Sequence, residues 1–70
     1  MTKEEIKKEI EAMKEHLEGV KEDIEIKTTR ILKDKDKLDY WDFYYLSNCY
    51  SDLNIITIKL KIIEEILKLF

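Results

Sequence analysis

Apolar residues in the first half of the chain recur at alternating intervals of four and three positions. The series is Ile6, Ile10, Met13, Leu17, Val20 and Ile24, and Ile31 resumes it one heptad later. This spacing places its members on one side of a helix, with a positions at 10, 17, 24 and 31 and d positions at 6, 13, 20 and 27. The pattern predicts a helix over residues 3–33, in which Thr2 and Glu5 form an N-terminal capping box.

The second half of the chain carries a similar seam without a change of phase. Its members are Leu46, Cys49, Leu53, Ile56, Leu60, Ile63, Leu67 and Phe70. They predict a helix over residues 39–69, capped by Asp39 and separated from the first helix by a charged turn, 34–38. Two stretches also suit other structures. Apolar and polar residues alternate over 56–62, as in a strand, and the polar side chains of 47–52 compete for backbone hydrogen bonds and favour a break.

Two heptad-bearing helices joined by a short turn predict an all-α fold. We expect an antiparallel two-helix hairpin with coiled-coil-like heptads, forming a single domain over residues 1–70. Matching a positions to d positions across the hairpin places Met13 opposite Leu60 and Ile10 opposite Ile63. The turn is then centred between Asp36 and Lys37. Other pairings that respect the heptads move the turn by three or four residues.

The predicted second helix has more apolar surface than the first helix can cover. Beyond its seam it carries Ile55, Ile58, Ile62, Ile66 and Leu69, whereas the first helix has few equivalents. A helix that is apolar nearly all round belongs in the interior of a larger assembly. This surplus predicts a homodimer in which two hairpins form a four-helix bundle with the second helices at its centre. Burial against a different protein is the alternative.

Composition sharpens the contrast between the two halves. Residues 1–37 contain 11 apolar residues, whereas the 33 residues from 38 to 70 contain 20. A single core of 70 residues is marginal, so a second molecule would help to stabilise it. Thirteen basic residues are interspersed among 16 acidic ones, for a net charge of −3, and create no general attraction for nucleic acid. Charges interrupt the apolar half too often for a membrane span, and we expect a soluble, cytoplasmic protein.

Catalytic and metal-binding combinations are weak in this sequence. His16 has no potential ligand at helical spacing, and Cys49 occupies a seam position without a basic neighbour one turn away. The aspartates at 34, 36, 39 and 42 lack the Gly and the closing Glu of a calcium loop. With one Gly in the chain, a Gly-rich phosphate loop is excluded. We therefore expect neither an enzyme nor a bound metal or cofactor.

Two surface features remain as candidate binding sites. The first is an aromatic cluster at the start of the second helix, Tyr40, Trp41, Phe43, Tyr44 and Tyr45. Such residues anchor protein interfaces, although they could equally close the open end of a bundle. The second is a basic tip next to these rings, Lys27, Arg30, Lys33, Lys35 and Lys37. Basic residues beside aromatic ones can bind single-stranded nucleic acid.

The function that these features favour is non-enzymatic. We expect a small acidic protein–protein interaction module, a regulator or inhibitor that binds a target protein through its aromatic and apolar second helix. The small size, the composition and the lack of a catalytic set also suit an accessory protein of a phage or mobile element. The alternative is a nucleic-acid-associated accessory protein that uses the basic tip and the adjacent aromatic residues.

Overall fold

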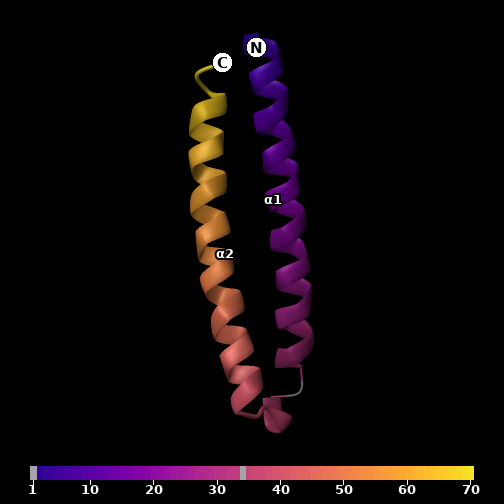
Figure 1. The fold of residues 1–70 in the computed structure, drawn as a ribbon. Coiled ribbons are helices and arrows are strands. Elements are labelled where there is room, and N and C mark those ends of the chain that lie inside the picture. The colour runs from indigo at the N-terminus through magenta and orange to yellow at the C-terminus, as the bar shows by residue number, and fades with distance from the viewer. Residues whose placement is uncertain (1, 34) are drawn as a thin grey trace.

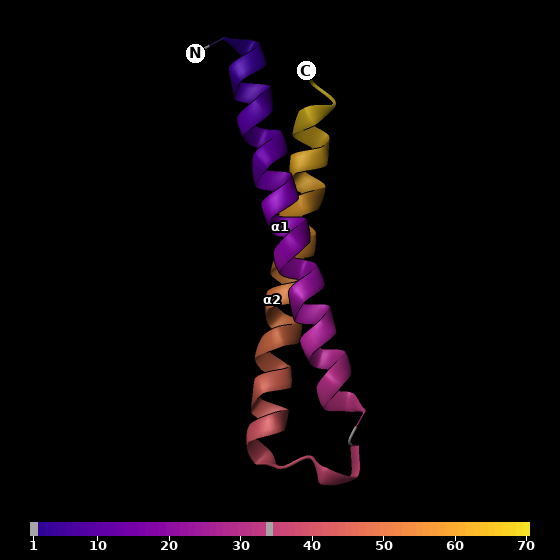
Figure 2. The same cartoon turned by 90° about the vertical axis from the view of Figure 1, so that its right-hand side faces the viewer.

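Two long helices account for most of the chain in this computed structural model, which describes residues 2–33 and 35–70, apart from the side chain of Lys35. Helix α1 spans Lys3–Leu32, and helix α2 spans Tyr40–Leu67. A 3-10 turn, η1, occupies Lys35–Lys37 between them. The helices run antiparallel and side by side, with both termini at one end of a rod 53 Å long (Figures 1 and 2). The prediction of an all-helical chain is confirmed over the described residues.

Side chains before each helix satisfy backbone N–H groups that have no partner within the helix. Thr2 accepts a hydrogen bond from the Glu5 N–H at 3.2 Å, as expected for an N-cap. A reciprocal capping box forms at α2 instead, where Asp39 accepts from the Asp42 N–H at 2.9 Å and the Asp42 carboxylate accepts from the Asp39 N–H at 3.2 Å. These caps fix the two helix starts.

Helix α2 is continuous through both stretches that allowed another structure. Residues 47–52 and 56–62 are helical throughout. Thr57, in the second stretch, donates its hydroxyl hydrogen to the carbonyl oxygen of Leu53 at 2.8 Å, a bond that satisfies a hydroxyl within a helix. The unbroken heptad therefore outweighs the strand preference of the β-branched residues. Over the described residues, neither helix is long and apolar enough to cross a membrane.

The core follows the predicted seam on α2 more closely than on α1. Four seam residues of α2 are buried, namely Leu46, Cys49, Ile56 and Ile63. The seam residues of α1 are at most half-buried, and Met13 remains 57% exposed. Lys27, at a d position of the sequence pattern, is exposed, whereas the next residue, Thr28, is buried. Thr28 fits there because its hydroxyl donates to the Glu25 carbonyl oxygen at 2.9 Å and its methyl group is apolar.

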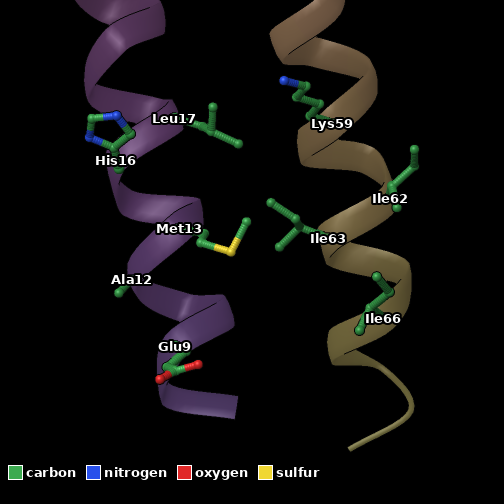
Figure 3. Close-up of a pocket in the computed structure, with 9 residues that line it drawn as sticks. All are labelled: Glu9, Ala12, Met13, His16, Leu17, Lys59, Ile62, Ile63 and Ile66. Carbon is green, nitrogen blue, oxygen red and sulfur yellow. The ribbon is translucent and has the colours of Figure 1, made fainter. Parts of the chain in front are cut away.

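The observed register differs from the predicted pairing by about one helical turn. Met13 and Ile63 point toward each other and line the same groove (Figure 3), whereas the sequence paired Ile63 with Ile10. The connection explains this difference, because the chain passes through η1 beyond the end of α1 before it enters α2 (Figures 1 and 2). The first turn of α2 consequently lies at the very end of α1, where Asp42 shares a small hollow with Arg30 and Ile31.

The cap of α2 offers a direct test of the helix boundary. Replacing Asp39 by Ala removes the acceptor for the Asp42 N–H, and we expect the free energy of unfolding to fall by about 1 kcal/mol. Urea unfolding followed by circular dichroism at one fixed protein concentration measures this change. Asp36→Ala is the matched control, because Asp36 is exposed and lies outside both α-helices. Equal losses for the two variants would contradict the assigned cap.

Candidate functional site

An apolar groove lies between the two helices. It has a volume of about 710 Å³ and lies near the end that carries the termini. Its lining comes from two segments about two turns long. They supply Glu9, Ala12, Met13, His16 and Leu17 of α1 and Lys59, Ile62, Ile63 and Ile66 of α2. Charged or polar side chains occur only at Glu9, His16 and Lys59 within this set. The groove thus offers a mainly apolar surface.

Small and exposed side chains on α1 leave the groove open. Ala12 supplies only a methyl group, and Met13, although it occupies a seam position, is mostly exposed. Figure 3 shows Met13, Leu17 and Ile63 pointing into the space between the helices, while Ile62 and Ile66 lie farther out on α2. The groove and the outer residues of α2 therefore form one continuous apolar surface.

The opposite flank of the seam carries polar groups. Lys14 Nζ lies 4.0 Å from Glu64 Oε1 across the two helices and 3.9 Å from Glu18 Oε1 within α1. Lys14, Thr28 and Glu64 all occupy the e positions of their heptads, whereas Glu9, His16, Lys59 and Ile66 occupy g positions. The helix pair therefore has one flank bridged by an ion pair and one flank that opens, near the termini, into a mainly apolar groove.

The predicted self-association residues remain largely exposed along α2. Ile55, Ile58 and Ile62 are each about half exposed, Ile66 is 38% exposed and Leu69 is 86% exposed. Ile62 and Ile66 line the groove, and both also line a shallower hollow that includes Leu69. The sequence located this stripe but gave no sign that it continues onto Ala12 and Met13 of α1. That continuity depends on which flank of the seam carries the groove. The spacing of apolar residues along one helix does not determine this.

The aromatic cluster stands exposed at the turn end of α2. Trp41 is 71% exposed and makes edge-to-face contacts with two neighbours, with ring centroids 5.4 Å from Tyr40 and 6.3 Å from Tyr44. Phe43 and Tyr45 are also exposed. All five side chains are at least 41% exposed, so they contribute little to the core of the single chain. Tyr40, Trp41 and Tyr44 form a preassembled group of exposed amphipathic side chains.

The basic residues of the predicted tip lie among acidic ones in the described part of the chain. Lys27, Arg30, Lys33 and Lys37 are exposed, and the side chain of Lys35 lies outside the described residues. Arg30 and Lys33 share a shallow hollow with Glu22 and Glu25, so acidic side chains lie among them. Asp42 lines a further small hollow with Arg30 and Lys37. This mixture weakens the attraction for phosphate groups.

The two candidate chemical groups occupy structural positions. His16 lies at the edge of the groove, and the described residues contain no cluster of three or more His, Cys, Asp or Glu side chains suited to a metal ion. Cys49 is buried at 6% exposure in the seam. Hydrogen bonding to Cys49, one turn along α2, raises the pKa of the Tyr45 hydroxyl above its ordinary value, with repulsion from the thiolate form as a second cause. Cys49 thus contributes to packing.

Comparison with protein families, with curated proteins and with solved structures found no match to this chain.

Burial of Cys49 predicts a slow reaction with thiol reagents. In the folded protein, we expect a water-soluble disulfide reagent to modify Cys49 at a rate limited by opening of the helix pair, because the thiol has little access to solvent. Addition of urea through the unfolding transition should accelerate modification in parallel with the loss of helix. Immediate, complete modification under native conditions would show that the seam does not bury this residue.

Proposed function

We propose that the chain is a non-enzymatic protein–protein interaction module that acts as a small regulator or inhibitor of a target protein. Two copies associate into a four-helix bundle through the outer stripe of α2, and the aromatic cluster at the turn end binds the target. The observation that carries this proposal is the set of exposed apolar side chains on α2, which fall mainly in two groups, one within 40–45 and one within 55–69. Soluble chains rarely leave exposed apolar groups of this size uncovered.

The total surface of the single chain supports a partner. It exposes 5914 Å². A compact monomer of the same mass, 8.5 kDa, is expected to expose about 4,650 Å². The excess of roughly 1,250 Å² reflects two helices that shelter only one narrow seam, and a four-helix bundle would cover much of it. Association of two copies is the simplest way to supply the missing layer.

The aromatic cluster supports a second, distinct contact. Trp and Tyr dominate the energetics of many protein interfaces, since their rings supply contact area at a low cost in conformational entropy. Here Trp41 is held between Tyr40 and Tyr44 by edge-to-face packing, so part of the ordering has occurred before any target binds. The intermixed acidic and basic side chains near the turn favour a protein target over nucleic acid.

Self-association is tested by analytical ultracentrifugation. At micromolar concentration we expect the wild-type protein to sediment with about twice the monomer mass of 8.5 kDa, and Ile62→Glu to sediment as a monomer, because the substitution places a charge within the apolar stripe. Asn54→Glu is the matched control, since it adds the same charge at an exposed position of α2 outside the stripe and the groove. Circular dichroism verifies that both variants remain helical.

The two outcomes bear on different parts of the proposal. A wild-type protein with the monomer mass would refute the homodimer. A dimer that persists in Ile62→Glu would instead show that the interface lies elsewhere on the molecule.

Target binding is tested with Trp41→Ala. Affinity isolation from host cells identifies a target, and calorimetry with the purified target compares the wild type, Trp41→Ala and the control Tyr50→Ala at 50 and 200 mM salt. Tyr50 is exposed to a similar degree as Tyr44 but lies outside the aromatic cluster. Loss of a hot-spot ring should weaken binding by about 30-fold, with little dependence on salt. Sedimentation of Trp41→Ala at the same concentrations separates loss of the target contact from loss of self-association.

A contrary result is equally specific. Binding of a single-stranded oligonucleotide that collapses between 50 and 200 mM salt, with the Trp41→Ala variant unaffected in its binding to protein, would favour the nucleic-acid alternative.

A further inference from the structure

We infer that the second copy covers the groove face in an antiparallel orientation, with α1 packed on α1 and α2 packed on α2 of the other copy. This inference rests on the proposed self-association and adds to it the face, the direction and the paired residues. It also brings α1 into the interface beside α2, whereas the sequence pattern alone predicted α2 at the centre of the bundle. The two-fold axis then lies across the rod, between the two layers, near its middle. The observations that determine this arrangement are the groove, the pattern of charges beside it and the size of the face.

The groove identifies which face is covered. Glu9 and His16 of α1 and Lys59 and Ile66 of α2 line it, and each pair is separated by seven residues. Positions seven apart keep to one side of helices that pack along a shared seam. Extending the two series along the helices adds Asp23 and Arg30 on α1 and Tyr45 and Asp52 on α2. All eight residues are exposed.

The series of charges along each helix of this face is complementary to the same series read in the opposite direction. The series on α1 reads Glu9, His16, Asp23, Arg30, so an antiparallel second copy places Glu9 opposite Arg30 and His16 opposite Asp23. The series on α2 reads Tyr45, Asp52, Lys59, Ile66, and reversal places Asp52 opposite Lys59 and the apolar Tyr45 ring opposite Ile66. Two of these pairs thus join groups of opposite charge, Glu9 with Arg30 and Asp52 with Lys59. A third pair joins the His16 imidazole to the Asp23 carboxylate.

A parallel arrangement lacks this complementarity. It would lay α2 of one copy on α1 of the other at the same level, and Asp52 would then approach Asp23, while Lys59 would approach His16. Like charges at a partly desolvated contact are destabilising and select against a wrong orientation. The charge pattern therefore favours the antiparallel pair.

Side-chain size agrees with the same axis. In α1 the reversal is centred between His16 and Asp23, which places Gly19 of each copy next to the axis, where a Cβ atom would have no neighbour within 4 Å in the single chain. In α2 the reversal is centred between Asp52 and Lys59, which brings Ile55 of the two copies together. The α1 helices can approach closely at Gly19, while the α2 helices meet through large apolar side chains.

The two centres lie at nearly the same level of the rod. Met13 faces Ile63 (Figure 3), and counting six residues from each along the antiparallel helices makes Gly19 level with Thr57. Thr57 is about two residues from the centre of the α2 series, or about 3 Å along the helix axis. One two-fold axis can therefore serve both helix pairs with a small crossing angle between the two copies.

The face is large enough for a stable dimer. It belongs to a rod with extents of 53 Å and 16 Å, so each copy offers roughly 800 Å², the area that one partner contributes to an interface of standard size. The opposite flank already joins its two helices through Lys14 and Glu64.

In this arrangement the two aromatic clusters lie at opposite ends of the dimer, and each gains Leu69 of the other copy as a neighbour.

Charge reversal tests the orientation. Asp52→Lys and Lys59→Asp should each weaken the dimer about 10-fold or more in sedimentation equilibrium, because each creates two like-charge contacts related by the axis. The double variant should return the affinity to within about threefold of the wild type. Lys61→Asp, at an exposed position outside the groove, is the control and should have little effect.

Two outcomes would overturn the inference. A tighter dimer in Asp52→Lys alone would favour the parallel arrangement, and a double variant weaker than both single variants would contradict the predicted pairing of Asp52 with Lys59.

Cross-linking tests the axis independently of charge. With a short bismaleimide, Ile55→Cys in a Cys49→Ala background should link to itself in high yield, whereas Ile66→Cys should not, because only residue 55 lies near the axis. Equal yields for the two variants would overturn the inference. A monomeric wild-type protein would overturn the proposed self-association as well, whereas a dimer with the wrong cross-linking pattern would leave the proposed function intact.

Discussion

Two helices packed against each other can bury only one narrow strip of each, and this limit governs the whole molecule. Only four apolar residues, all on α2, are buried in the described part of the chain, and no large side chain there is completely enclosed. Ordering each residue costs on the order of 1.5 kcal/mol, so a seam of this width leaves little surplus stability. The apolar residues outside the seam therefore matter as much for the behaviour of the protein as those within it.

Much of the fold could be predicted from the periodicity of apolar residues. The heptads located both helices to within one or two residues at their ends, and Thr2 and Asp39 identified their starts. The register could not be obtained in the same way, because several pairings satisfy the heptads equally well. The path of the chain through η1 selects among them and moves Ile63 from Ile10 to Met13. Burial of Thr28 in place of a d-position residue likewise depends on local hydrogen bonding.

The candidate site was visible in part. Exposed isoleucines and aromatic rings on the second helix are evident from their spacing, and the structure leaves them uncovered. The groove was not evident, since its α1 side consists of Ala12, Met13 and His16, which lack an obvious signal when taken singly. Their significance comes from lying beside Ile62 and Ile66 on one flank while Lys14 and Glu64 bridge the other. The reversed charge pattern becomes apparent only after that flank is known.

Coupling between folding and association connects these features. If the seam alone were sufficient, the helix pair would unfold at a temperature independent of its concentration. If a second copy supplies the missing layer, mass action stabilises the folded state as concentration rises. The most direct measurement is therefore thermal unfolding of the wild-type protein by circular dichroism over a 100-fold range of concentration. We predict that Tm increases steadily across this range, and a constant Tm would contradict the proposal that the chain needs a second copy of itself.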